Sequence, residues 1–153
     1  EEGGIIVDKS LFYAGTAGLD ISVAIQKNVS SALFGGEGLI QTRIAGSGVA
    51  VLYSPVPKDE IVRHELHGDK LWVDGNFALM RSERVNFKAE KSSKSLLSTA
   101  VSGEGLLQTF EGEGFVWLAP TQGIYEKLSL PSGLQALAGA PGSSHTETSA
   151  AKR

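Results

Sequence analysis

A repeated glycine motif constrains the fold of this chain more than any other feature of its sequence. Residues 36–42 read Gly-Glu-Gly-Leu-Ile-Gln-Thr, and residues 103–109 read Gly-Glu-Gly-Leu-Leu-Gln-Thr. A second Gly-x-Gly triplet and a short apolar run follow each copy, at residues 46–52 and 112–118. Two copies of one glycine-punctuated, β-prone unit predict an internally duplicated β structure.

The repeat extends upstream of the glycine motifs. Residues 5–8 (Ile-Ile-Val-Asp) align with residues 71–74 (Leu-Trp-Val-Asp), and the offset in numbering between them is 66. The offset becomes 67 at the glycine motif and returns to 66 at the Gly-x-Gly triplet that follows it. An insertion balanced by a deletion is the pattern expected of two diverged copies of one module.

Alternating residues predict strands within each copy. Leu19, Ile21, Val23 and Ile25 alternate with polar or small residues, a period of two that is typical of a half-buried strand. Residues 85–90 repeat this alternation.

Glycine-bearing loops predict the turns between strands. The triplets at 46–48 and 112–114 predict hairpin loops, and His67-Gly68-Asp69 and Asp74-Gly75-Asn76 predict further turns.

We therefore predict an all-β fold of two homologous antiparallel modules, packed as a pseudo-symmetric sandwich or barrel. The modules cover approximately residues 5–57 and 60–121, and a final strand covers residues 124–130. From residue 131 to residue 153 we expect a short helix, opened by the capping-box spacing of Ser132 and Gln135, and then a flexible tail.

The composition narrows the classes of function. The chain has 153 residues and a formal net charge of −3, so it has no global attraction for nucleic acid or an anionic membrane. Cysteine is absent, which excludes thiolate chemistry and fits a reducing intracellular compartment. No apolar run approaches the ~20 residues needed to cross a bilayer. The sequence begins without methionine or a targeting pattern, so we expect a piece of a longer protein.

The glycines of the two motifs are interpreted as turn residues and not as a phosphate-binding loop. A phosphate loop needs Gly-Lys-Ser or Gly-Lys-Thr at the start of a helix, whereas these glycines lead into predicted strands. Glycine is favoured in tight turns because it tolerates positive φ. The predicted turn glycines are Gly36, Gly38, Gly46, Gly48, Gly103, Gly105, Gly112 and Gly114.

His64, Glu65 and His67 form the one crowded group of metal-ligand residue types. In a strand, Glu65 and His67 share one face while His64 points to the other, which opposes a three-ligand site. We therefore predict no metal and no cofactor. The sequence also lacks a nucleophile elbow and an opposed pair of carboxylates, so we do not expect an enzyme.

One stretch of the chain is basic. It contains Arg81, Arg84, Lys88, Lys91 and Lys94. Two acidic residues dilute it, and a nucleic-acid site would require exposed aromatic residues between the basic ones. A solvated strand edge is the simpler interpretation, because lysine-rich edges resist strand addition.

Aromatic residues are predicted to pack in the core: Trp72, Phe110, Phe115, Trp117 and Tyr125. The run at residues 115–118 is apolar at consecutive positions, so both faces of that strand require cover from another sheet or from a partner chain. This pattern favours a protein partner or a homo-oligomer.

The paired Gly-Glu-Gly-Leu motifs, with Leu-Trp-Val-Asp-Gly-Asn-Phe-Ala at residues 71–78 between them, resemble the AIM24 family. The resemblance covers about residues 8–130. It implies a fold like that of the tryptophan RNA-binding attenuation protein, with three β modules around a pseudo-threefold axis, of which this chain resembles the middle and last. It also implies a role in organising membranes or assemblies in mitochondria, or an undefined cytosolic role, and no catalytic residues. A missing module would leave sheet edges uncovered, so we expect a longer chain or a partner to cover them.

These observations predict a non-enzymatic scaffold or interaction domain with a protein partner or a homo-oligomeric state. The alternative is a module that binds RNA or anionic lipid through the basic stretch at residues 81–94. Peripheral membrane association stays open, and nucleic acid is the less expected partner. An enzyme with a cleft where the modules meet is a third hypothesis, without a supporting motif.

Overall fold

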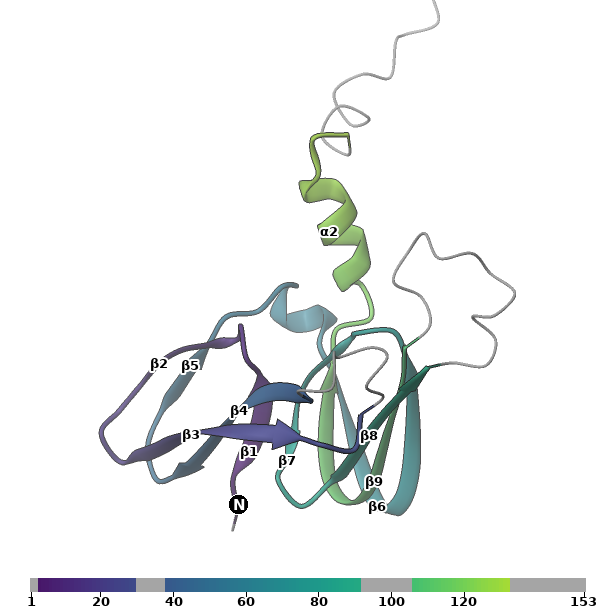
Figure 1. The fold of residues 1–153 in the computed structure, drawn as a ribbon. Coiled ribbons are helices and arrows are strands. Elements are labelled where there is room, and N and C mark those ends of the chain that lie inside the picture. Colours follow the sequence, from purple (N-terminus) through teal and green to yellow (C-terminus); the bar gives the residue numbers. More distant parts are fainter. Residues whose placement is uncertain (1–2, 30–37, 92–105, 133–153) are drawn as a thin grey trace, which may run out of the picture. The chain divides into compact units, whose positions relative to one another are not determined.

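A computed structural model describes residues 3–29, 38–91 and 106–132 (Figure 1). The strands are β1 (Ile5–Asp8), β2 (Phe12–Gly15), β3 (Leu19–Gln26), β4 (Leu39–Gly46), β5 (Ala50–Leu52), β6 (Val62–Asp74), β7 (Ala78–Ser82), β8 (Asn86–Lys91) and β9 (Leu106–Leu118). A 3-10 turn at Lys58–Glu60 precedes β6, and the helix α2 (Gln122–Ser129) follows β9. The predicted all-β class is confirmed.

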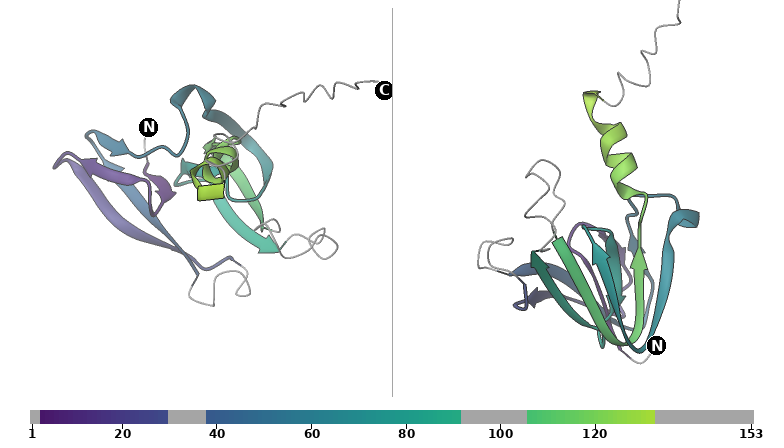
Figure 2. Two further views of the ribbon diagram at one scale, coloured as in Figure 1. Left: turned by 90° about the horizontal axis from the view of Figure 1, so that it is seen from above. Right: turned by 90° about the vertical axis from the view of Figure 1, so that its right-hand side faces the viewer.

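Seven strands form one curled antiparallel sheet. Its order is β3-β4-β1-β7-β9-β6, with β8 paired to the first half of β9, and β2 pairs with β5 in a separate two-stranded sheet. The strands β6 to β9 curl into a half-barrel (Figure 2). β1 lies between β4 and β7 and so joins the first half of the chain to the second.

The duplication is visible in the strand register itself. When both residue numbers of a pair are raised by 66, every pair of β1 with β4 becomes a pair of β6 with β9; Ile5↔Ile44, for example, becomes Leu71↔Phe110. The pairs of β2 with β5 become those of β7 with β9, and their register shift recurs at the same place. Six consecutive pairs of β3 with β4 become the pairs of β8 with β9. The two modules therefore share one pairing scheme.

The structural offset stays at 66 throughout these strands, which corrects the offset of 67 read from the glycine motif. The motif aligns Gln41 with Gln108, but the strand pairing makes Thr42 the counterpart of Gln108. A shift of one residue moves a side chain to the opposite face of a sheet. Residues that match in the sequence motif therefore occupy different positions in the strand pairing of the two modules.

The predicted hairpin at residues 46–48 is wrong, because β4 and β5 pair with other strands and not with each other. The chain bends here from one sheet to the other, with φ 90° at Gly46. A Cβ at Gly48 would clash with Thr16 Oγ1, which accepts a hydrogen bond from the Val49 amide, so the bend requires glycine. The predicted hairpin at residues 112–114 is also wrong. Gly112 and Gly114 lie inside the continuous strand β9, which β6 pairs along its length.

The remaining glycine predictions have mixed outcomes. The turn predicted at Gly68 is a β-bulge inside β6, where φ is 83°. The turn predicted at Gly75 is confirmed between β6 and β7, with φ 91°. Gly38, with φ 84°, leads into β4. Gly36, Gly103 and Gly105 lie outside the described residues.

The main hydrophobic core lies in the second module. Its buried members are Leu66, Val73, Val85, Phe87, Ala89, Phe110 and Val116. The alternation predicted for residues 85–90 is confirmed, since Phe87 and Ala89 are buried while Lys88 is exposed. The rings of Phe87 and Phe110 pack with centroids 5.3 Å apart, a favourable tilted contact.

The predicted final strand at residues 124–130 is wrong, because the chain forms the helix α2 there. Ile124 and Leu128 are four residues apart and share one helical face, and the Ser129 hydroxyl donates to the Tyr125 carbonyl at 2.8 Å. Pro131 follows and favours the end of a helix. The chain divides into two compact units, Glu1–Gln122 and Gly123–Arg153. The tail predicted for the end of the chain lies outside the described residues.

Candidate functional site

The two modules meet where β1 pairs with β7, a contact called the module junction below. Its register is Ile5↔Ser82, Ile6↔Arg81 and Val7↔Met80. One step further, the Glu83 amide donates to the Gly4 carbonyl at 2.8 Å. Ile6 and Val7 on the β1 side of the junction are buried.

Two free strand edges correspond to the two sides of this junction. The second half of β6 is the counterpart of β1, and β6 pairs with β9 alone among the described strands. β2 is the counterpart of β7, and it pairs with β5 alone among the described strands. We call these the β6 edge (residues 70–74) and the β2 edge (residues 12–15). The β6 edge thus corresponds to the β1 side of the module junction, and the β2 edge corresponds to its β7 side.

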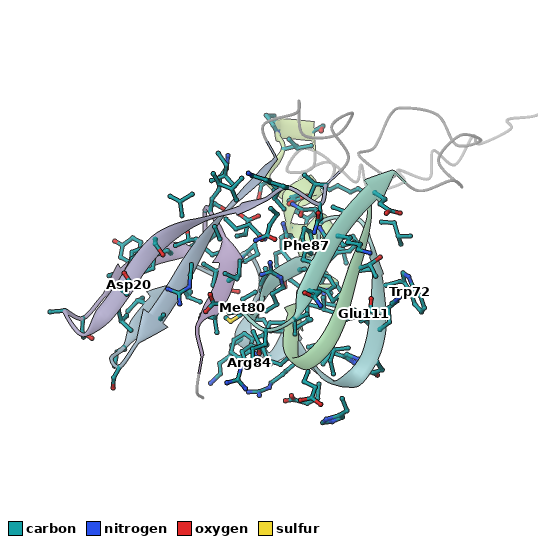
Figure 3. The ribbon with its side chains drawn as sticks, turned by 60° about the horizontal axis from the view of Figure 1, so that its bottom comes forward. Asp20, Trp72, Met80, Arg84, Phe87 and Glu111 are labelled. Carbon is teal, nitrogen blue, oxygen red and sulfur yellow. The ribbon has the colours of Figure 1, made fainter. Side chains whose placement is uncertain are left out.

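Apolar positions that the junction buries are exposed on the free edges. Ile6 is 5% exposed, whereas its counterpart Trp72 on the β6 edge is 62% exposed and projects away from the sheet (Figure 3). Leu79 on β7 is 6% exposed, whereas its counterpart Tyr13 on the β2 edge is 79% exposed. Trp72 was predicted to lie in the core, and this prediction is wrong because no described strand pairs beyond β6 at this position.

β3 presents a further exposed apolar face. The strand predicted from the alternation of Ile21, Val23 and Ile25 is confirmed, but all three side chains are exposed. On β8 the counterparts of Ile21 and Val23, Phe87 and Ala89, are buried, in part because the segment after β3 lies beside that strand. There the Ala89 amide donates to the Asn28 carbonyl at 3.2 Å. Large exposed apolar patches are typical of interaction surfaces in soluble proteins.

The doubly apolar run at residues 115–118 is covered by the chain itself. Phe115 and Val116 are buried, and Trp117 and Leu118 are partly buried. The Arg63 guanidinium lies 4.4 Å from the centroid of the Phe115 ring. This run therefore requires no partner chain, and the structural support for association lies on β2, β3 and β6.

The predicted basic surface is not continuous. Arg81 is only 4% exposed, because its position on β7 turns it toward the interior. Arg84 and Lys88 are exposed. Lys91 ends β8, and Lys94 lies outside the described residues. A binding role for Arg84 and Lys88 stays a prediction.

A charged cluster ties the first module to the turn between β7 and β8. Arg43 on β4 pairs with Glu83 at 2.6 Å and with Asp20 at 3.0 Å. Glu83 also accepts from the Gly4 amide at 3.1 Å. The hydrogen bond from Arg43 lowers the pKa of Glu83, and the same bond raises the pKa of Arg43. The cluster therefore favours the ionised forms of both groups.

The described residues include no group of three His, Asp or Glu side chains placed to hold a metal ion. Glu65 and His67 share one face of β6 and His64 faces the other way, as the alternation predicts. Glu65 pairs instead with Arg63 at 2.6 Å. A search of the same residues for a helix long and apolar enough to cross a bilayer finds none.

Sequence reasoning did not identify the two free edges as sites. The repeat does relate the two edges to the junction, because the common offset of 66 aligns Trp72 with Ile6 and Leu79 with Tyr13. The residue types at these matched positions do not indicate which of the two side chains is buried by a neighbouring strand. That distinction depends on the pairing of β1 with β7, a contact between modules that no local pattern encodes.

Comparison with known protein families gives one match. A search among curated proteins finds no significant match. Residues 1–121 match the model of the family described as Mitochondrial biogenesis AIM24. The matched residues contain both modules, from β1 to β9. The chain therefore belongs to the AIM24 family.

Proposed function

We propose that this chain is a non-enzymatic assembly domain that joins β modules of one kind edge to edge. The partner is a second copy of the chain, which places its β2 edge beside the β6 edge of the first. The observation that carries the proposal is that the β6 edge and the β2 edge, the counterparts of the two sides of the module junction, have no further pairing partner among the described strands.

The internal junction supplies the expected register between copies. In the contact between copies, β6 of one copy takes the place of β1, and β2 of the other copy takes the place of β7. With the offset of 66, the pair Ile6↔Arg81 of the junction then corresponds to Trp72↔Gly15 between the copies. The neighbouring pairs become Leu71↔Thr16 and Val73↔Ala14. Because one patch meets a different patch, the contact is heterologous and forms a ring or a filament according to the rotation between copies.

Two physical terms support this pairing. Unpaired strand edges expose backbone N–H and C=O groups that another strand can satisfy. The pairing also covers Trp72 and Tyr13, which are largely exposed in the single chain. Burial of apolar surface contributes about 25 cal/mol per Å². The exposed apolar face of β3 lies in the same module as the β2 edge and enlarges the surface available to the second copy.

Light scattering coupled to size-exclusion chromatography tests the proposal over a range of protein concentrations. The unmodified chain is expected to associate, and Trp72→Glu is expected to remain monomeric because it places a charge on the β6 edge. Val62→Glu is the matched control, since Val62 is an exposed residue in the first half of β6, away from the β6 edge. A monomeric unmodified chain at every concentration, or unchanged association of Trp72→Glu, contradicts the proposal.

We also propose that the assembly operates in mitochondria. The support is the description of the family, which refers to mitochondrial biogenesis. Fractionation of cells that express the complete protein tests this proposal, and recovery in the cytosolic fraction alone contradicts it.

Binding of RNA or anionic lipid through the basic stretch is a weaker second candidate. Among the described side chains of this stretch, Arg84 and Lys88 support it because they are exposed, whereas Arg81 is buried. Salt-dependent binding that is lost on reversal of the Lys88 charge would favour it over assembly.

A further inference from the structure

A polar cleft lies between the first module and the β7–β8 region, apart from the free edges. It has a volume of about 450 Å³. Its apolar wall includes Ile6, Ile25 and Phe87, and its polar wall includes Asn28, Asn86 and Lys88. The volume lies within the range of roughly 300–1,000 Å³ that is typical of small-molecule sites.

Arg81 lines this cleft, and within the described part of the chain its Nε and Nη1 donors have no hydrogen-bond partner. It is 4% exposed, and neither Nε nor Nη1 has an acceptor within reach. Its guanidinium lies 5.3 Å from the centroid of the Phe87 ring, a contact that leaves the N–H donors unsatisfied. A buried charge without a partner is costly, so an unpaired guanidinium here indicates a counter-ion that binds from the cleft.

The carboxylates that line the cleft form ion pairs with cationic side chains other than Arg81. Glu83 is paired with Arg43 at 2.6 Å and also accepts from the Gly4 amide. Glu111 pairs with Lys70 at 3.1 Å. Burial lowers the pKa of Arg81 to about 10, and the charge of Glu83 partly opposes this shift, so Arg81 is positively charged at neutral pH.

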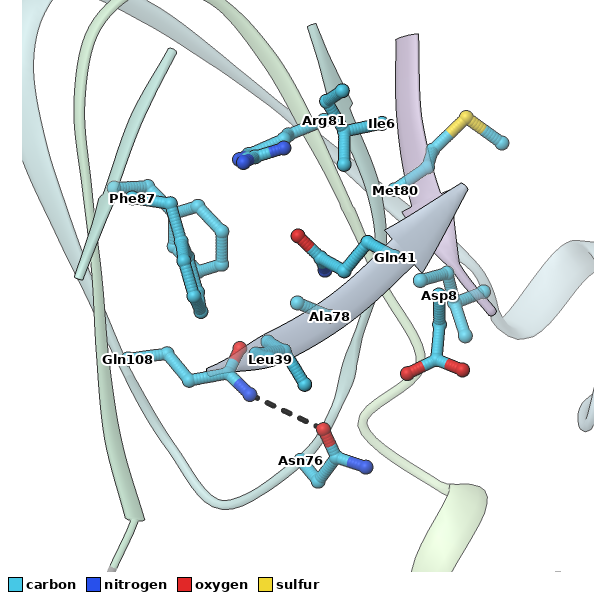
Figure 4. Close-up of a pocket in the computed structure, with 12 residues that line it drawn as sticks. Ile6, Asp8, Leu39, Gln41, Asn76, Ala78, Met80, Arg81, Phe87 and Gln108 are labelled. Atoms are coloured by element: carbon cyan, nitrogen blue, oxygen red, sulfur yellow. Dashed lines mark hydrogen bonds between the residues drawn. The ribbon is translucent and has the colours of Figure 1, made fainter. Parts of the chain in front are cut away.

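A small cavity on the other side of Arg81 does not remove the need for an anion. It has a volume of about 10 Å³, which is room for about one water molecule. Gln41 on β4 and Arg81 on β7, the two neighbours of β1 in the sheet, project toward Phe87 in this region (Figure 4). The Oε1 atoms of Gln41 and Gln108 have no donor and are suited to such a water. A neutral water leaves the charge of Arg81 uncompensated.

We propose that the cleft binds an oxyanion, the phosphate or carboxylate group of a small polar molecule, with Arg81 as its principal ligand. A planar guanidinium donates two parallel hydrogen bonds to such a group. Lys88 at the exposed rim adds a second positive charge. The amides of Asn28 and Asn86 are available to hydrogen-bond the polar remainder of the molecule.

The test follows the Nε–H signal of Arg81 by two-dimensional nitrogen NMR during titration with inorganic phosphate. Saturable movement of this signal is expected, and Arg81→Met is expected to reduce phosphate affinity at least about tenfold, measured on backbone amides that line the cleft. Arg84→Met is the matched control, since Arg84 is an exposed arginine outside the cleft lining, and its affinity is expected to be unchanged.

A second variant covers the case in which Arg81→Met does not fold. Ile25→Glu changes an exposed residue of the cleft wall and is expected to fold and to weaken phosphate binding by repulsion. Phosphatidylcholine vesicles with added phosphatidic acid form a second arm. Movement of the Arg81 signal with vesicles and not with free phosphate assigns the oxyanion to a lipid headgroup. No response to either probe, or equal responses in the Ile25→Glu variant and the unmodified chain, overturns the proposal.

Discussion

Val23 on β3 and Ala89 on β8 occupy equivalent positions in the two modules, yet Val23 is 69% exposed and Ala89 is fully buried. The strand pairing around the two residues is the same. What differs is the second edge of each strand. Asn28 and Val29 lie beside Ala89, whereas β3 pairs with β4 alone among the described strands, through Val23↔Thr42. The β3 face of the first module is therefore exposed at a position where the equivalent β8 face of the second module is covered.

This difference predicts opposite responses to the same substitution. Val23→Lys is expected to change the free energy of unfolding by less than about 0.5 kcal/mol. Ala89→Lys is expected to lower it by about 3 kcal/mol or more, because it places a charge in the core. Urea denaturation followed by fluorescence measures both values. Similar destabilisation by the two substitutions would show that the β3 face is covered in the isolated chain.

Two aromatic residues, Phe110 in the core and Trp72 on the β6 edge, are expected to contribute differently to stability. Phe110 is 2% exposed and packs on Phe87, so Phe110→Ala is expected to cost about 3–5 kcal/mol. Trp72→Ala is expected to change the stability of the monomer by less than about 0.5 kcal/mol, because Trp72 is mostly exposed. Calorimetric unfolding of the dilute monomer gives both numbers, and a large cost for Trp72→Ala would place this residue in the core after all.

The unpaired guanidinium of Arg81 predicts a substitution that does not destabilise the chain. Replacement by Met keeps a long apolar side chain and removes a buried charge, so the free energy of unfolding is expected to stay the same or to rise by about 1–4 kcal/mol. Arg84→Met, at an exposed site, is expected to have no effect. A loss of more than about 1 kcal/mol for Arg81→Met in phosphate-free buffer would indicate that Arg81 has a partner within the protein.

The Arg43–Glu83 pair is expected to account for part of the loss of folding stability at acidic pH. Its hydrogen bond lowers the pKa of Glu83 below the ordinary value of 4.5. A depressed folded-state pKa contributes stability that is present above the unfolded-state pKa and is lost as the pH falls through the folded-state pKa. Stability is therefore expected to decline below about pH 4.5, and Glu83→Gln is expected to flatten this part of the profile. An identical acid profile for Glu83→Gln would exclude the pair as a contributor.

The sequence predicted the class of fold and the duplication, because both depend on local signals. Alternation at residues 85–90 and the turn at Gly75 depend on the nearest neighbours along the chain, and both are confirmed. The hairpins predicted at Gly46 and Gly112 failed for a non-local reason. A glycine at positive φ serves a turn, a bend or a bulge equally well, and the available pairing partners decide which of these forms.

The candidate site was harder to predict than the fold. Arg81 was grouped with the exposed basic residues because it lies near Arg84 and Lys88 in the sequence. On β7, however, it faces the inner side of the sheet and is buried. Trp72 was assigned to the core because it is large and apolar. Both errors concern which side of a strand is covered, and that depends on how the two modules meet.

Disulfide trapping between single-cysteine variants tests the central claim most directly, since the chain contains no cysteine of its own. A Cβ at Gly15 would meet the flexible end of the Leu19 side chain at 2.9 Å and the Phe12 ring at an ordinary contact distance of 3.5 Å, so Gly15→Cys is expected to be accommodated. Directly paired residues of antiparallel strands lie about 4.5–5.5 Å apart at Cα, which suits a disulfide.

Mixing Gly15→Cys with Trp72→Cys under mild oxidation is predicted to give a crosslinked dimer much faster than mixing Val23→Cys with Trp72→Cys. The second mixture pairs residues of similar exposure that do not face each other in the expected register. Equal rates in the two mixtures would contradict the assembly of copies through the β2 and β6 edges.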